Sequence, residues 1–262
     1  MPITRAELKD IQSLRTKKGR KEKKRFIAEG VRVLEEALQG ELAPERVFYA
    51  PAALSERGER LVSELRSRRV TVSEVSTREL KAMSDAETTQ GTVGVFPIPD
   101  CRLDKLYRSE YRRLLLCDGL ADPGNLGTLI RSALAFEFDL VMVTEQTAEA
   151  YAPKVVRSSA GAVFGVPVAE VSTDELLSFA GQHDLALIAA DIHGKDDMPA
   201  LERTVKEHPF VLAVGSEASG VSRKIRDGAG LLIRIGHSPR VESLNSGIAG
   251  SILMKQIYDM LK

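Results

Sequence analysis

Apolar residues occur along this chain in two patterns, as short continuous runs and as longer stretches with a helical period. The runs 210–214 and 231–235 are almost entirely apolar, which is typical of strands that helices cover on both faces. The last segment instead repeats its apolar residues about every 3.6 positions, as an amphipathic helix does. Those residues are Leu244, Ile248, Ile252, Leu253, Ile257 and Met260. Because both patterns alternate over the whole length, we expect an α/β fold.

The first part of the chain predicts a small α/β domain. Thr4 and Glu7 have the spacing of a capping box, in which each side chain satisfies a free backbone amide of a starting helix. The other expected elements are strands at 26–30, 47–50, 70–75 and 92–96 and helices at 31–38, 54–68 and 77–83. Pro97 and Pro99 end the pattern, because such close prolines cannot continue a central strand. We therefore expect a first domain over 1–97 and a linker over 98–110.

The remaining residues, 111–262, alternate again and predict a second, larger α/β domain. Its expected strands are 113–117, 140–144, 166–171, 185–191, 210–214 and 231–235. Its expected helices are 126–136, 151–159, one that begins at the capping box of Ser172 and Glu175, and the last segment. Ligands of open α/β sheets bind at the carboxyl ends of the strands, so the loops that follow the strands are the candidate sites.

Composition fits this picture and narrows the class of protein. The 262 residues are 43% hydrophobic and 28% charged, which is typical of a soluble globular protein, and tryptophan is absent. No apolar run approaches the length needed to span a membrane, and the N-terminus lacks the apolar stretch of a signal peptide. We therefore expect a cytoplasmic protein without a membrane partner.

Cysteine and histidine usage does not indicate a metal site. Cys101 and Cys117 have neither metal-binding nor redox spacing. The four histidines form no close ligand pair, so a metal would need ligands brought together only by the fold. We expect no metal.

Positive charge is concentrated near the N-terminus. The whole chain has a net charge of zero, whereas residues 1–32 contain eleven Lys and Arg against four acids, 11 − 4 = +7. Such an asymmetry favours a polyanionic partner, although a charged run can also be no more than a solvated helix face. The candidate RNA-binding residues are Lys17, Lys18, Arg20, Lys21, Lys23, Lys24 and Arg25.

Polar side chains gather in the loop after the first strand of the second domain. Pro123 and Gly124 predict a tight turn there, and Asn125 is a suitable N-cap for the helix that follows. Gly127 lies one turn before Arg131 and leaves that guanidinium free to reach a phosphate or carboxylate. On its own, the loop could hold only a helix cap and a solvated arginine.

Two later loops repeat this arrangement. The loop 215–220 is rich in glycine and contains Glu217, but it has neither the dinucleotide-binding fingerprint nor the phosphate-binding P-loop, which disfavours a nucleotide-dependent oxidoreductase. Ser243 and Asn245, with Glu242, stand at the start of the last helix, where either of the first two could be an ordinary N-cap. Because all three loops follow strand ends, we expect one composite site.

These motifs resemble those of a known family. Asn125-x-Gly127-x3-Arg131, Gly215-x-Glu217-x2-Gly220 and Ser243-Leu244-Asn245 are similar, in order and spacing, to the three motifs of the SpoU (TrmH) branch of the SPOUT RNA methyltransferases. The basic stretch from Lys17 that leads into 26–30 resembles the ribosomal protein L30e-like substrate-binding domain often attached to that family. Together the resemblances cover nearly the whole chain.

The resemblance implies an L30e-like α/β domain followed by a SPOUT α/β domain with a deep trefoil knot, which periodicity would not have suggested. It implies a homodimer through the C-terminal domain, S-adenosylmethionine as cofactor, and methyl transfer to a ribose 2′-hydroxyl of structured RNA. The expected catalytic residues are Arg131, Asn125, Glu217, Ser243 and Asn245. The expected cofactor-binding residues are Gly215, Ile235 and Leu244.

We expect Arg131 to act as a clamp on the phosphate beside the reacting ribose and Glu217 to orient Arg131. The chain departs from the family at Gly236 and His237, where a proline and a methionine are common. We expect a more mobile rim of the cofactor pocket there and interpret His237 as a surface residue.

Family analogy favours 23S ribosomal RNA as the substrate, with transfer RNA as an alternative. A non-catalytic RNA-binding or ribosome-associated protein is a further alternative. The complete set of Asn125, Arg131, Glu217 and Asn245 speaks against it, because binding alone would not need that set.

Overall fold

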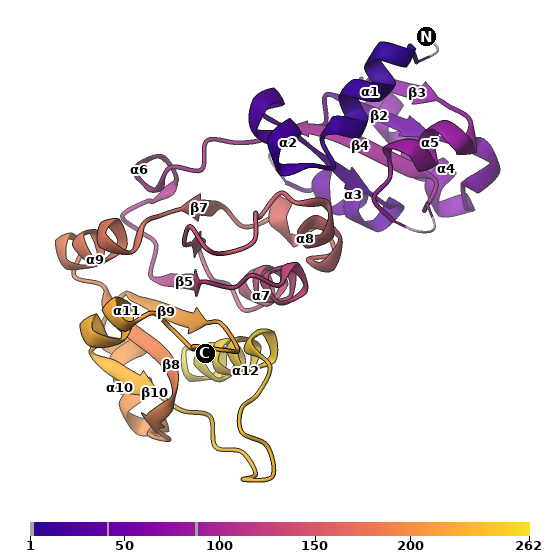
Figure 1. Cartoon of the computed structure of the whole chain (residues 1–262). Coiled ribbons are helices and arrows are strands. Elements are labelled where there is room, and N and C mark those ends of the chain that lie inside the picture. The colour runs from indigo at the N-terminus through magenta and orange to yellow at the C-terminus, as the bar shows by residue number, and fades with distance from the viewer. Residues whose placement is uncertain (1–2, 41, 87–88) are drawn as a thin grey trace. The chain divides into compact units, whose positions relative to one another are not determined.

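The computed structural model describes residues 3–40, 42–86 and 89–262 (Figure 1). Contacts divide the chain into two compact units. Unit 1 comprises Met1–Pro99 and Tyr151–Gly165, and unit 2 comprises Asp100–Ala150 and Val166–Lys262. Within the described ranges, no helix is both long and apolar enough to cross a membrane.

Unit 1 contains a four-stranded mixed sheet in the order β1-β4-β2-β3. Its strands are β1 (Arg25–Glu29), β2 (Arg46–Tyr49), β3 (Val72–Glu74) and β4 (Thr92–Pro97). Only β2 and β3 run parallel, since β4 pairs antiparallel with both β1 and β2. The helices are α1 (Arg5–Ser13), α2 (Lys17–Lys23), α3 (Val31–Ala37), α4 (Glu56–Ser67) and α5 (Thr77–Met83), with a short 3-10 turn η1 (Pro51–Ala53). The small α/β unit expected near the N-terminus is thus present.

The start of unit 1 differs from the sequence prediction in two ways. Thr4 Oγ1 accepts the backbone N–H of Glu7 at 3.2 Å, but the Glu7 carboxylate pairs with Arg46, so only half of the expected capping box forms. The basic stretch, for which no element was predicted, contains helix α2. Thr16 Oγ1 caps α2 by accepting the N–H of Gly19 at 3.1 Å, and the helix ends at Lys24 in a left-handed conformation with φ of 53°.

An aromatic cluster explains why 151–165 belongs to unit 1. This segment contains α8 (Pro153–Ser158) and the 3-10 turn η2 (Ala162–Phe164). Tyr151 packs on Phe26 of β1 with ring centroids 4.8 Å apart, and Phe164 packs on Phe96 of β4 at 4.7 Å. All four rings are buried, so the aromatic core of unit 1 is shared between the start and the middle of the chain. The sequence pattern gave no sign of this association.

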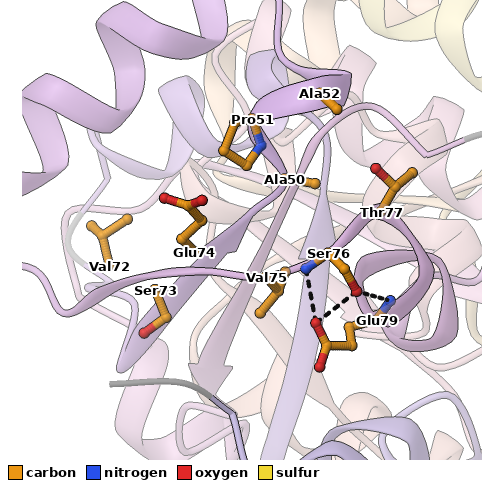
Figure 2. Close-up of a pocket in the computed structure, with 10 residues that line it drawn as sticks. All are labelled: Ala50, Pro51, Ala52, Val72, Ser73, Glu74, Val75, Ser76, Thr77 and Glu79. Carbon is orange, nitrogen blue, oxygen red and sulfur yellow. Dashed lines mark hydrogen bonds between the residues drawn. The ribbon is translucent and has the colours of Figure 1, made fainter.

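A cavity of about 800 Å³ opens at the carboxyl ends of β2 and β3 (Figure 2). Glu74 and Glu79 are among the residues that line it. Glu79 accepts the backbone N–H and the hydroxyl of Ser76 at 2.8 and 2.7 Å and thereby completes the capping box of α5. Two carboxylates make this cavity unsuited to phosphate, so it is a poor candidate for RNA contact.

Unit 2 contains a six-stranded sheet in the order β10-β8-β9-β5-β6-β7, in which neighbouring strands pair in parallel (Figure 1). The strands are β5 (Arg113–Asp118), β6 (Leu140–Val143), β7 (Val168–Glu170), β8 (Ala186–Lys195), β9 (Phe210–Gly215) and β10 (Leu231–Ile233). The helices are α6 (Leu103–Leu106), α7 (Pro123–Ala135), α9 (Thr173–Gln182), α10 (Met198–Glu207), α11 (Arg223–Gly228) and α12 (Ser246–Met260). All six strands were predicted, whereas α6, α10 and α11 were not.

Helix α6 lies in the stretch that the sequence predicted to be a linker. Its Leu103 is buried in the apolar core of unit 2, beside strand residues such as Leu116 and Met142. The two prolines before it end the first sheet as expected, but the chain enters the second core sooner than their pattern indicated.

The strand order of unit 2 favours a ligand site at the carboxyl ends of its two central strands, β9 and β5. The chain passes from β5 to β6 on one side, and β9 later pairs with β5 on its other side. Loops that leave neighbouring strands in opposite directions open a ligand site at the carboxyl ends of those strands. The loops after β5 and β9 therefore meet at one place, and they contain Asn125 and Glu217.

Asp10 of α1 joins the basic stretch to the core of unit 1. Its two carboxylate oxygens pair with Lys23 and Arg25, each at 2.5 Å. The hydrogen bond from Lys23, followed by the charge of Arg25, lowers the pKa of Asp10 below its ordinary value of 3.8. The interaction therefore stabilises the fold above that ordinary value and is lost as pH falls through the lowered pKa.

Replacing Asp10 by asparagine is expected to reduce the free energy of unfolding by about 1 kcal/mol at pH 7, because a partly exposed ion pair contributes no more than that. The difference from wild type should shrink as pH falls through the lowered pKa of Asp10 and disappear below it, where the native carboxyl is itself protonated. Urea denaturation followed by circular dichroism at pH 7 and at lower pH values measures it. The control is Glu59→Gln, because Glu59 is exposed and has no ion pair among the described residues. A loss of unfolding free energy in Asp10→Asn that does not change with pH would contradict this account.

Candidate active site

Helix α7 begins one turn earlier than predicted, and this frees Asn125. The carboxylate of Asp122 caps the helix by accepting the backbone N–H of Asn125 at 3.0 Å. Pro123 suits the first helical position, because its missing N–H would have no partner there. The prediction that Asn125 is the N-cap is therefore wrong. As a residue of the first turn, Asn125 can direct its side chain to other loops.

The loop after β9 is closed on itself by two backbone hydrogen bonds between Ser216 and Gly220, at 3.0 and 2.8 Å. Gly220 has φ of +65°, which favours glycine. A side chain at Gly215 would lie 2.0 Å from the backbone of Gly220, so the loop can be this tight only with glycine there. The turn places Glu217 at its exposed tip.

Asn245 is the N-cap of α12, one of the two alternatives that the sequence left open. Its Oδ1 accepts the backbone N–H of Ile248 at 3.1 Å. Since the oxygen of the amide is committed to the helix, the amide nitrogen must point the other way. The cap thus orients the donor that the site uses.

The three loops meet in one hydrogen-bond network. Asn245 Nδ2 donates to Asn125 Oδ1 at 2.9 Å and also to Glu217 Oε1. Asn125 Nδ2 donates to the same Glu217 oxygen at 3.1 Å. One carboxylate oxygen therefore accepts from two amides, each at the start of a different helix. The convergence expected of these three residues is present.

Glu217 does not hold Arg131, contrary to our expectation. Its Oε1 accepts from the two amides, and no hydrogen bond joins the carboxylate to Arg131. Arg131 lies farther along α7 and is exposed, and its side chain makes no hydrogen bond or ion pair with any residue in the described ranges. A substrate group therefore has free access to the guanidinium.

A cavity of about 460 Å³ adjoins the network. All three expected cofactor-binding residues, Gly215, Ile235 and Leu244, line it, and so does Ser243. The wall combines apolar side chains from the ends of β9 and β10 with the carboxylates of Glu217 and Glu242. An apolar slot with a few polar groups is typical of a small-molecule site.

His237 is not the surface residue that we expected. It is half-buried, lines the cavity, and its Nδ1 lies 2.8 Å from the carbonyl oxygen of Ile235. Because a carbonyl can only accept, this contact places a proton on Nδ1. The neighbouring Gly236 lies so close to the Asp196 carboxylate that a Cβ would come within 2.3 Å of it.

Two residues of the cavity wall were missed from the sequence, Asp191 and Arg226. Asp191 directly follows the apolar run 185–190 within β8, so attention to the polar residue after each apolar run could have found it. Arg226 lies on α11, for which no helix was predicted, and no sequence signal indicated it.

The exposed and half-buried residues of the candidate RNA-binding set differ in whether their charge is paired. Lys17, Lys21 and Lys24 are exposed and have no ion pair with a described residue. Lys18 has a loose pair with Glu22 at 3.8 Å, and Lys23 and Arg25 are held by Asp10.

Arg20 requires a correction. It is only 5% exposed and donates to the backbone carbonyls of Leu14 and Arg15, both at 3.0 Å. These bonds satisfy carbonyls at the end of α1. Arg20 is therefore a structural residue and is removed from the candidate RNA-binding set.

The described residues contain no cluster of potential metal ligands, and the buried Cys117 is an unreactive thiol. Within them, no group of three or more His, Cys, Asp or Glu side chains is placed to hold a metal ion. Burial in β5 raises the pKa of the Cys117 thiol well above its ordinary value, so it stays protonated and unreactive.

Comparison with known proteins gives matches over nearly the whole chain. In sequence, the chain is 29% identical to the 23S rRNA (guanosine(2553)-2'-O)-methyltransferase RlmP of Bacillus subtilis (strain 168), covering 95% of this chain and 94% of that protein. It is 28% identical to the human mitochondrial rRNA methyltransferase 3, covering 90% of this chain and 67% of that protein.

Solved structures agree with these matches. The crystal structure of an RNA 2'-O ribose methyltransferase superposes with a TM-score of 0.84 at 28% identity, over 100% of this chain and 99% of the other. The AdoMet-bound rRNA methyltransferase from Sinorhizobium meliloti gives 0.85 at 26% identity, over 100% and 97%.

Two family models match successive parts of the chain. The MRM3-like substrate binding domain matches residues 5–94. The SpoU rRNA Methylase family matches residues 112–255, more than half of the chain and the whole of the Asn125–Glu217–Asn245 network. The α/β fold is that of the SPOUT methyltransferases, and the family's fold implies the trefoil knot expected from the motifs. The chain belongs to the SpoU rRNA methylase family.

Proposed function

We propose that this protein is an S-adenosylmethionine-dependent RNA 2′-O-ribose methyltransferase whose substrate is ribosomal RNA, with 23S rRNA favoured. The network that joins Asn125, Glu217 and Asn245 carries this proposal, because a pure binding protein would have no need of three converging loops beside a cofactor-sized cavity. The names of the relatives that act on ribosomal RNA support the choice of substrate. A ribosomal substrate also agrees with the cytoplasmic location expected from the sequence.

The cavity fits the cofactor in shape and in charge. Gly215, with no room for a side chain, presents backbone to the ligand, while Ile235 and Leu244 supply apolar surface for a purine. Glu217 and Glu242 suit a ligand that carries both a sulfonium and an ammonium charge. When bound, S-adenosylmethionine supplies an electrophilic methyl group.

The chain's own residues mainly align the reactants. The amides of Asn125 and Asn245 are both bonded to Glu217, so the starts of α7 and α12 keep a fixed position relative to each other. Arg131, exposed and unpaired within the described ranges, clamps the phosphate beside the target ribose and stabilises the oxyanion that develops on the attacking hydroxyl. Guanidinium groups stay protonated at physiological pH, which makes Arg131 unsuited to remove the proton itself. Ser243 lies on the cavity wall, where it can position the substrate.

Arg131→Ala is expected to lower methyl transfer by about 100- to 1000-fold, the usual cost of a lost electrostatic donor in a transition state. Cofactor affinity should change little, because Arg131 does not line the cavity. Ribose methylation is to be mapped in RNA from cells that lack the gene and are complemented with wild type, Arg131→Ala or Arg223→Ala. Arg223, 92% exposed on α11, is the matched loss of charge.

Restoration of a ribose methyl in 23S rRNA by wild type and by Arg223→Ala, but not by Arg131→Ala, is the expected result. If Arg131→Ala restores full methylation, its proposed role is wrong. If wild type restores a methyl only in transfer RNA, the proposed substrate is wrong.

The RNA-binding surface of unit 1 is proposed to centre on Lys17, Lys21 and Lys24. These three are exposed and have no ion pair among the described residues, so they are free to release counterions from RNA phosphates. Lys18, Lys23 and Arg25 lie in the same stretch and contribute less, since acidic neighbours partly neutralise them.

Replacing Lys17, Lys21 and Lys24 together by alanine should weaken RNA binding and reduce the slope of log affinity against log salt by roughly 2, since each lost phosphate contact contributes somewhat less than one unit. Binding isotherms at several salt concentrations measure both effects. The control removes the same charge from other exposed, unpaired positions of unit 1, namely Arg60, Arg78 and Lys81. Equal losses in the two triple variants would show that only net charge matters.

The homodimer expected through the C-terminal domain is proposed to form on the helix pair α7 and α12. These helices pack on each other, and Ser132 of one is hydrogen-bonded to Ser251 of the other at 2.7 Å. Leu134 and Ile248 on the same pair are large apolar side chains that are 39% and 54% exposed. Burial of such residues stabilises an interface.

A further inference from the structure

An ion pair with a buried carboxylate stands in the wall of the cofactor cavity, formed by elements that the asparagine–glutamate network does not use. Asp191 comes from β8 and its side chain is only 1% exposed. Its Oδ2 accepts from Arg226 Nε at 2.6 Å, and its Oδ1 accepts the backbone N–H of His193 at 2.8 Å. Both oxygens are therefore fixed, and Asp191 cannot turn away from the arginine.

Arg226 is bonded through one edge only. No hydrogen bond or ion pair from its two terminal nitrogens to a described residue is present, although the side chain is 37% exposed and lines the cavity. Gly220 lies beside this guanidinium, since a Cβ there would be at an ordinary contact distance of 3.6 Å from a terminal nitrogen. The result is an oriented set of N–H donors with no assigned acceptor.

Charge decides what kind of acceptor fits. A buried carboxylate is tolerated when it is paired, and the pair of Asp191 with Arg226 is neutral as a whole. An anionic group that approached Arg226 would also meet the Asp191 charge, whereas a neutral oxygen would not. The ribose of S-adenosylmethionine carries two neighbouring neutral hydroxyls, whose oxygens can accept hydrogen bonds from a guanidinium.

We propose that Arg226 binds the ribose hydroxyls of S-adenosylmethionine and that Asp191 positions it. Arg226 donates N–H groups to the hydroxyl oxygens, and Asp191 acts through Arg226 by fixing its orientation and compensating its charge. The proposal rests on the proposed cofactor site. The other titratable residues among those that line the cavity are Glu217, Glu242, Arg234, His193 and His237, and in the described residues none of their side chains is bonded to Asp191.

The test compares S-adenosylhomocysteine with its 2′-deoxy and 3′-deoxy analogues by isothermal titration calorimetry. Wild type should prefer the parent ligand by about tenfold over at least one analogue, as expected for one hydrogen bond from a charged donor. In Arg226→Gln the affinity for the parent should fall by about tenfold and that for the same analogue should stay within about twofold. The preference would then vanish, while the unchanged analogue shows that the cavity is intact.

Arg234→Gln is the matched control, because Arg234 lines the same cavity but is exposed and not anchored by a carboxylate. It should keep the wild-type preference. Equal losses for all three ligands in Arg226→Gln would make Arg226 merely structural and overturn the proposal. If Arg226→Gln weakens binding of all these ligands but binds a decarboxylated analogue as tightly as wild type does, Arg226 contacts the amino-acid end of the cofactor. That result would also overturn the proposal.

Asp191→Asn separates positioning from packing. If Asp191 acts through Arg226, the single variant should lose the same preference, and the double variant with Arg226→Gln should lose no more than Arg226→Gln alone. Additive losses would contradict the positioning role. Failure of wild type to bind S-adenosylhomocysteine would instead show that the cofactor site itself is wrong, whereas binding with unchanged preferences would overturn this inference alone.

Discussion

The site depends on one carboxylate oxygen that accepts two amide N–H groups. Glu217 Oε1 holds the side chains of Asn125 and Asn245, and through them the first turns of α7 and α12. Each amide is also fixed by its place in a helix, since Asn245 caps α12 and Asn125 stands in the turn that Asp122 caps. Loops alone would be free to move, but these are tied to the ends of two packed helices. The network therefore transfers the rigidity of the sheet and helices to the place where the substrates must meet.

The same arrangement explains why Arg131 is left free. If Arg131 were paired with Glu217, the pair would be neutral as a whole, and the carboxylate would compete with any other anion for the guanidinium. In this structure the carboxylate accepts from the two amides, and the side chain of Arg131 has no partner among the described residues, so its positive charge stays available. The two charged motif residues thus have separate tasks, which their spacing in the sequence could not reveal.

Much of the fold could be predicted because its signals are local. Continuous apolar runs located all six strands of unit 2, and the capping box of Ser172 and Glu175 begins α9 as expected. The predictions that failed concern side chains whose partners are distant in the sequence. Glu7 turns to Arg46 in place of Thr4, and Arg20 turns inward to the end of α1.

The site was predictable to a similar degree. Strand ends and motif spacing indicated Asn125, Glu217 and Asn245, because the carboxyl edge of a sheet collects its loops in one place. The cap of α7 was misplaced by one turn, since Asp122 and Asn125 are both good caps and only the position of Pro123 favours the former. Asp191 and Arg226 were missed because only their ion pair brings them to attention, and the pattern of apolar residues along the chain does not predict that pair.

The aromatic cluster of unit 1 has a consequence for how this protein is made. Phe26 and Phe96 are synthesised early, but their ring partners Tyr151 and Phe164 follow much later in the chain. During translation, the first sheet must therefore wait with exposed rings until the middle of the polypeptide has left the ribosome. Non-local contacts of this kind slow folding and expose apolar surface in the interim. An excised N-terminal fragment would remain in that unfinished state and be prone to aggregate.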